Sequence, residues 1–169
     1  MENILKREFK IERIFNAPPG ILWKMWTEPE LVMKWWGPEQ FTSPVVKIDL
    51  RVGGKYLYCM RGSSSPGQPI KDFWSGGVYK EIIPQEKIVC TDSFTDEKGN
   101  IVEPVVYGMP AAFPREGLVT FTFEAIGDNQ TKVTILYATE SEAVLEAMLK
   151  VQMKEGWENS LEKLAKNLK

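Results

Sequence analysis

Hydrophobic and polar residues alternate along much of the chain, which is the spacing expected of β-strands that bury one face in a core. Residues 118–126 show the pattern most clearly, because Val119, Phe121 and Phe123 alternate with two threonines and a glutamate. Turn-forming residues separate these stretches, so consecutive strands are expected to pair as hairpins of an antiparallel sheet. The predicted strands, about six or seven in number, are residues 6–15, 45–52, 55–61, 73–83, 87–94, 118–126 and 132–138.

Two parts of the chain change to the three-and-four spacing of an amphipathic helix. After the first strand, a proline-rich turn and Pro29 divide this pattern into two short helices, and Gly37-Pro38 ends the second. At the C-terminus, a Thr139-x-x-Glu142 capping box precedes a proline-free stretch with apolar residues at helical spacing. About 28 residues at 1.5 Å each make a helix of about 42 Å, long enough to cross a whole sheet.

These elements predict an α+β fold, with a curved antiparallel sheet around a long C-terminal helix, and one domain spanning residues 1–169. Gly156 lies on the apolar side of that helix, where glycine costs about 1 kcal/mol relative to alanine. Two explanations remain open: Gly156 permits close approach of helix and strand, or small residues leave volume unfilled beneath the helix. The irregular segment 95–117 carries five large apolar residues and is expected to pack over the rest of the fold as a lid or binding loop.

The composition excludes several kinds of functional site but does not identify one. The 169 residues include 21 Lys and Arg against 23 Asp and Glu, so no strong field attracts nucleic acid. The absence of histidine excludes His-dependent catalytic triads, and with only two cysteines no classical zinc site is expected. Cys59 and Cys90 lie in apolar strands, which favours two buried thiols over a redox pair. We expect no cofactor, no metal, no signal peptide and no membrane span, and the cytoplasm as location.

Several short motifs are spread in order over nearly the whole chain. They are Asn16-Ala17-Pro18, Trp35-Trp36-Gly37-Pro38, Asp49-x-Arg51-x-Gly53-Gly54, Gly77-x-Tyr79-x-Glu81-Ile82-x-Pro84-x-Glu86-Lys87-Ile88 and Gly156-Trp157-x-x-Ser160-Leu161-x-x-Leu164. Together these motifs resemble those of the START-like (SRPBCC) superfamily, whose members have a helix-grip fold. Within it, the chain is most similar to the family related to the C-terminal domain of the activator of heat shock protein 90 ATPase.

The resemblance implies a ligand cavity between the sheet and the C-terminal helix, and three functions compete. The first is the binding of a small hydrophobic ligand, as in the lipid carriers of the superfamily. The second is regulation of a chaperone ATPase, although the eukaryotic activator carries a further N-terminal domain for which 169 residues leave no room. The third is a cyclase or hydrolase acting on a hydrophobic substrate, for which no catalytic constellation is recognisable. A homodimer is also compatible with the sequence.

Alternation and position select the expected cavity walls, which are mainly aromatic residues and methionines. Filling of an ordinary core would explain the same residues without a ligand. Asp49 and Arg51 share a strand face and are candidate polar anchors for a ligand, or a structural ion pair near a hairpin. The expected ligand-binding residues are Trp26, Trp35, Tyr58, Met60, Trp74, Phe94, Phe121, Met148, Gln152 and Met153.

Overall fold

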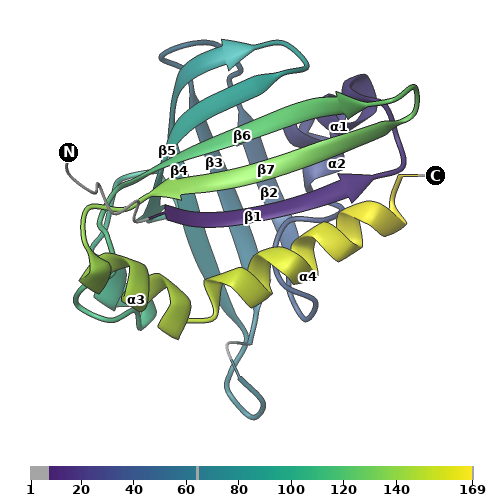
Figure 1. Ribbon diagram of the computed structural model, residues 1–169. Coiled ribbons are helices and arrows are strands. Elements are labelled where there is room, and N and C mark those ends of the chain that lie inside the picture. Colours follow the sequence, from purple (N-terminus) through teal and green to yellow (C-terminus); the bar gives the residue numbers. More distant parts are fainter. Residues whose placement is uncertain (1–7, 64, 169) are drawn as a thin grey trace, which may run out of the picture.

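The computed structural model describes residues 8–63 and 65–168, and it confirms the α+β, helix-grip-like fold. Seven antiparallel strands form one curved sheet in the order β1-β7-β6-β5-β4-β3-β2, with α4 running along it (Figure 1). Consecutive strands from β2 to β7 are neighbours, and β1 adds to β7 at one edge. The strands are β1 Glu8–Phe15, β2 Thr42–Ile48, β3 Lys55–Gly62, β4 Lys71–Ile83, β5 Lys87–Thr95, β6 Gly117–Ile126 and β7 Gln130–Ala138.

Strand pairing follows the alternation in the sequence. In β7, Val133, Ile135 and Tyr137 are buried and alternate with partly exposed residues. Ile11 of β1 is opposite Ile135, and Phe121 of β6 is opposite Ile135 on its other side, so apolar residues meet across three strands on one face. This face holds most of the core and faces the C-terminal helices.

The two short helices after β1 form as predicted, as α1 (Pro19–Thr27) and α2 (Pro29–Val32), each with proline in its first turn. Trp35 follows α2 and is fully buried. Its indole N–H donates to the Met25 carbonyl at 2.8 Å, which ties the end of α2 back to α1. Trp35 is therefore a packing residue with a satisfied polar atom.

The sequence predicted one continuous C-terminal helix, but the structure has two helices there: α3 (Glu142–Lys150) and α4 (Met153–Lys166). Gln152 adopts the left-handed conformation, with φ of 60°, and redirects the chain between them. Ser141, rather than Thr139, caps α3, because its hydroxyl accepts a hydrogen bond from the Val144 amide at 3.3 Å. Apolar spacing alone could not reveal the break, since the residues at the join keep the helical pattern.

The left-handed Gln152 leads to a stability prediction. A non-glycine residue in this conformation costs about 1–2 kcal/mol, which glycine avoids. We expect Gln152→Gly to raise the free energy of unfolding by about 1 kcal/mol, or Tm by about 2–4 °C in a domain of this size. Gln152→Ala keeps a Cβ atom, and with it the cost of the left-handed conformation, so it is the matched control in thermal unfolding. Equal Tm values for the two variants would show that the join carries no backbone strain.

The segment between β5 and β6 packs over the sheet only in part. It contains a short 3-10 helix, η1 (Pro104–Tyr107). Val105 and Val106 are 58% and 65% exposed, so the prediction that they pack inward was wrong. Tyr107 does pack: its ring contacts Phe94, with ring centroids 5.2 Å apart, and its hydroxyl donates to the Thr95 carbonyl at 2.6 Å. These contacts fix the segment over the end of β5.

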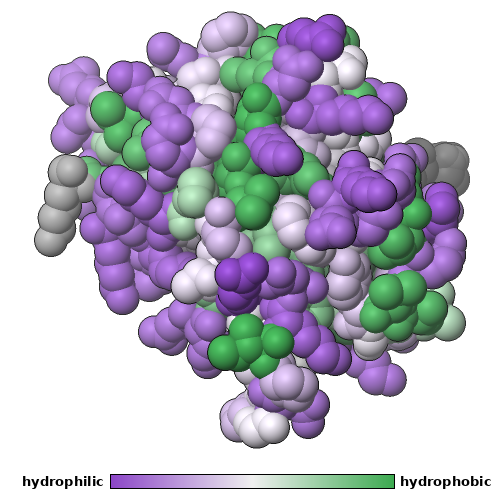
Figure 2. Space-filling view, turned by 180° about the vertical axis from the view of Figure 1, so that it is seen from behind, coloured by the Kyte–Doolittle hydropathy of each residue, from purple (hydrophilic) through white to green (hydrophobic). Residues whose placement is uncertain are grey.

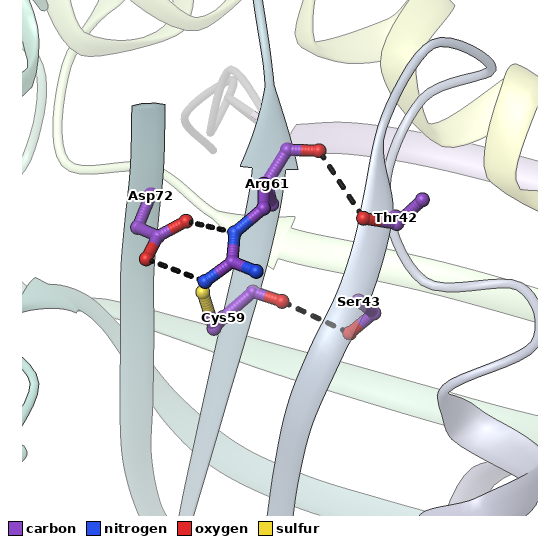
Figure 3. A network of polar contacts seen from close by, with 5 residues as sticks. All are labelled: Thr42, Ser43, Cys59, Arg61 and Asp72. Carbon is purple, nitrogen blue, oxygen red and sulfur yellow. Dashed lines mark hydrogen bonds and ion pairs between the residues drawn. The ribbon is translucent and has the colours of Figure 1, made fainter. Parts of the chain in front are cut away.

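A polar network joins β2, β3 and β4 near one end of the sheet (Figure 3). Arg61 donates two hydrogen bonds to Asp72, at 2.7 and 3.1 Å, and the Ser43 hydroxyl donates to the Cys59 carbonyl at 3.0 Å. Burial, together with the Asp72 carboxylate, raises the pKa of the Cys59 thiol to about 11. Cys90 is also buried and unpaired, and burial raises its pKa too. Both cysteines are therefore neutral thiols near pH 7, as the sequence suggested, and poor nucleophiles.

Apolar residues are exposed at scattered positions of the described chain, among them Val52, Ile70 and Val106. Figure 2 shows hydrophobic residues near the middle of the face opposite to Figure 1, with polar residues around and between them. Single exposed apolar side chains are normal for a globular protein. Within the described ranges, no helix is long and apolar enough to cross a membrane.

Candidate functional site

A cavity of about 240 Å³, partly open to solvent, lies between the sheet, the helices α3 and α4, and the loop before β6. Its lining is mostly apolar, and the aromatic and methionine side chains come from every wall. An apolar cavity of about 150 Å³ accommodates benzene, so this one suits a molecule of one or two rings. It is lined by Trp36, Gly37, Pro38, Met60, Ser75, Asp92, Ser93, Phe94, Met109, Phe113, Pro114, Gly117, Tyr137, Met148, Val151, Gln152, Met153, Gly156, Trp157 and Ser160.

Gly156 helps to keep this volume empty. A Cβ atom built on Gly156 would lie 3.6 Å from Cγ of Pro38, an ordinary van der Waals contact, and Pro38 itself lines the cavity. The glycine is therefore not required for close packing against a strand. Of the two explanations left open by the sequence, the structure favours unfilled volume beside the helix.

A second, much smaller cavity of about 20 Å³ lies deeper in the core. The two cavities meet at Trp36, Asp92 and Tyr137, which line both. Aromatic rings surround the junction: the centroid of the Trp36 ring is 4.6 Å from that of Tyr58 and 5.3 Å from that of Trp157. The inner cavity, lined by Trp26, Trp36, Tyr56, Tyr58, Tyr79, Ile88, Cys90, Asp92, Val119, Phe121 and Tyr137, is the deep end of the site.

Asp92 is the one ionisable carboxyl group in the lining of the main cavity. The Tyr137 hydroxyl donates to its Oδ2 at 2.9 Å, and the Tyr56 hydroxyl lies 3.4 Å from its Oδ1. Burial raises the pKa of Asp92, although the hydrogen bonds from Tyr137 and Tyr56 lower it in part. Lys and Arg do not occur in the lining of either cavity, so no cation there offsets the effect of burial on the pKa of Asp92.

Lys163 of α4 fixes one wall of the main cavity. Its ammonium group donates to the carbonyls of Pro38 and Phe41, both at 3.0 Å. Burial lowers the pKa of Lys163, with Glu39 acting in the opposite direction. Arg13 of β1 also forms an ion pair with Glu162 at 2.9 Å. These contacts hold α4 against both β1 and the turn after α2.

The residues predicted as cavity walls fall into three groups. Met60, Phe94, Met148, Gln152 and Met153 line the main cavity. Trp26, Tyr58 and Phe121 line the small inner cavity. Trp35 and Trp74 line neither: Trp35 is sealed in the core, and Trp74 is next to the cavity-lining Ser75 on β4, so that it points to the opposite face of the sheet.

The candidate anchors Asp49 and Arg51 lie outside both cavities. They form an ion pair of 2.9 Å in the connection from β2 to β3, and their side chains are 53% and 71% exposed. In such an exposed position a pair contributes at most about 1 kcal/mol. The structure thus assigns the pair to the hairpin, and it separates these residues from the site.

Asp92 is the functional candidate that sequence reasoning missed. Ile88, Cys90, Asp92 and Phe94 share one face of β5, and three of the four are apolar. A lone carboxylate on the core-facing side of a strand is the signal that could have identified it. Trp36, Tyr137 and Trp157 were also missed, because aromatic residues at such positions look like ordinary core. Among the residues that the structure describes, no three His, Cys, Asp or Glu side chains cluster as a metal site would require.

Comparison with known proteins identifies the family. A model of the family described as "Activator of Hsp90 ATPase homolog 1-like protein" matches residues 16–169, nearly the whole chain. The chain belongs to this family. This confirms the resemblance on which the fold prediction partly depended. A search of curated proteins finds no match to the sequence.

Solved structures with the same fold come from several bacteria. Protein Ms6760 from Mycobacterium smegmatis has a TM-score of 0.79 and 22% identity, covering 100% of this chain and 94% of that one. A protein from Arthrobacter aurescens has a TM-score of 0.78 and 25% identity, with 99% and 89% coverage. The AHSA1 protein from Silicibacter pomeroyi has a TM-score of 0.68 and 20% identity, with 95% and 96% coverage. At these identities the likeness concerns the fold of the Hsp90 ATPase activator family, and function must be argued from the site.

Proposed function

We propose that the protein binds one small, largely apolar molecule of one or two rings in the main cavity. The observation that carries the proposal is a 240 Å³ cavity with mostly apolar walls and a single carboxyl group at its deep end. Ligand pockets typically combine apolar walls with a few placed polar groups. Four methionines, Met60, Met109, Met148 and Met153, line it, and their flexible side chains adapt to ligands of varied outline.

Direct binding of naphthalene tests the proposal. Because the indoles of Trp36 and Trp157 line the cavity, a bound aromatic molecule should change tryptophan fluorescence in a saturable, one-to-one manner. Isothermal titration calorimetry at matched concentrations gives the stoichiometry independently. Burial of apolar surface also predicts a negative heat-capacity change. A fluorescence change that rises linearly without saturation, with no calorimetric heat, would contradict the proposal.

An assay of ATP hydrolysis by heat shock protein 90 distinguishes the function of a carrier from that of a chaperone regulator. For a cytoplasmic carrier, adding the protein to heat shock protein 90 should leave the rate of ATP hydrolysis unchanged. An increase in that rate, retained when the cavity is blocked by substitution, would favour the chaperone role over the carrier role.

A further inference from the structure

The inner cavity is large enough for one water-sized group, such as a single oxygen atom that accepts hydrogen bonds. A cavity needs about 10–15 Å³ of accessible volume to hold a water-sized group, and this one offers about 20 Å³. It is too small for a ring. Trp36, Asp92 and Tyr137 line both cavities, so the inner cavity adjoins the space that a molecule in the main cavity would occupy.

Two hydrogen-bond donors in the walls of the inner cavity lack protein acceptors. The indole N–H groups of Trp26 and Trp36 are both buried, and neither finds an acceptor on any residue that the structure describes. The neighbouring Trp35 shows the usual solution, since its N–H donates to a backbone carbonyl. Leaving a buried donor unpaired costs about 1–3 kcal/mol, so two such groups at one small cavity indicate a place for an acceptor.

Asp92 lies at the same junction but adds no unpaired donor. Its Oδ2 accepts from the Tyr137 hydroxyl at 2.9 Å, and its Oδ1 lies 3.4 Å from the Tyr56 hydroxyl, which also contacts the Thr91 carbonyl at 2.6 Å. Both carboxyl oxygens therefore face tyrosine hydroxyls. The unpaired donors of the inner cavity are the two indole N–H groups.

We propose that the inner cavity receives the oxygen of an uncharged carbonyl group, so that the ligand of the main cavity is a small aromatic or alicyclic carbonyl compound. This rests on the proposed function, and it narrows the class of ligand. A carboxylate, such as that of a fatty acid, would meet Asp92 at the junction without a cation in either lining. An amine would bring further N–H donors to a pocket whose free groups are donors.

A matched pair of ligands tests the inference. 2-Acetylnaphthalene and 2-isopropenylnaphthalene have nearly the same shape, but only the ketone has an acceptor oxygen. Trp36→Phe keeps an aromatic ring and removes one donor, so it should weaken binding of the ketone about threefold to tenfold more than binding of the alkene. Trp26→Phe is a second, independent removal of a donor with the same expected result. Trp23→Phe, one turn earlier in α1 and outside both cavities, is the control and should affect neither ligand.

The carbonyl stretching frequency gives a readout that depends on hydrogen bonding alone. The infrared band of bound ketone, labelled with ¹³C at the carbonyl, should lie below its position in dry hydrocarbon and move back towards it in Trp36→Phe. An unshifted band would overturn the inference, and so would equal losses of affinity for the ketone and the alkene in the variants. In either case, binding of both ligands to the wild-type protein would still support the proposed function. Tighter binding of 2-naphthoate than of the ketone would also overturn it. If neither the hydrocarbon nor the ketone binds, the proposed function and this inference are rejected together, whereas binding of the hydrocarbon without the ketone rejects this inference alone.

Discussion

Asp92→Asn should be more stable than the wild-type protein at pH 8, with a higher Tm, and the two should converge near pH 4. The folded state raises the pKa of Asp92, mainly by burial, so the folded protein holds a proton that the unfolded chain, with a pKa of about 3.9, releases. The contribution of Asp92 to stability is therefore fully present below about pH 4 and is lost as the pH rises through the folded-state value. Asparagine stays neutral throughout and avoids this loss.

The measurement is thermal unfolding of both proteins at intervals from pH 4 to pH 8. In a domain of this size, each 1 kcal/mol moves Tm by about 2–4 °C. Hydrogen bonds from Arg61 and Asn100 lower the pKa values of the exposed carboxylates of Asp72 and Asp96, respectively. The stability that these two groups contribute is lost at acidic pH in both proteins alike, so it does not change the difference between the two curves. Asp49→Asn, in the exposed ion pair, is the control and should follow the wild type. Parallel curves for Asp92→Asn and wild type would show that Asp92 ionises normally.

Gly156→Leu should abolish the binding of naphthalene, with a loss of affinity beyond the range of the titration, and leave the protein folded. The added side chain starts 3.6 Å from Pro38 and has the main cavity beside it. Leucine also has a helix propensity nearly 1 kcal/mol better than glycine, so Tm should be equal or higher.

Two variants make the result specific. Gly156→Ala adds one methyl group, gains the same helix propensity and should keep most of the affinity. Glu158→Leu adds the same apolar side chain at an exposed position of α4 and should bind naphthalene as wild type does. Undiminished binding by a folded Gly156→Leu variant would place the ligand elsewhere on the protein.

The fold was predictable because its signals are local and repeated. The described strands lie within about two residues of their predicted bounds, except β2, whose actual range begins and ends earlier than expected; residues 6 and 7 of the first predicted strand lie outside the described residues. Alternation fixes which side chains share a face, so Tyr58, Met60 and Phe94 were correctly placed on the cavity side. Trp74 lies on the opposite face of β4 from Ser75, because neighbouring residues of a strand point to opposite faces of the sheet.

The site was less predictable because its features depend on packing between distant segments. Nothing in the Trp35-Trp36 pair says which indole seals the core and which faces a cavity; the structure separates them by the acceptor that Met25 offers to Trp35. The break at Gln152 is equally hidden, since glutamine has no preference for a left-handed backbone. Asp92 was visible as an acid on an apolar strand face, but its partners Tyr56 and Tyr137 come from strands 36 and 45 residues away.

The ammonium group of Lys163 fixes the width of the main cavity. Its two carbonyl acceptors belong to the turn that also carries Pro38, while the lysine belongs to the helix that carries Gly156 and Trp157. The four-carbon side chain thus acts as a spacer between opposing walls. A shorter amine at position 163 would either draw the walls together or leave both carbonyls without a donor, so the width of the main cavity is set in part by a residue outside its lining.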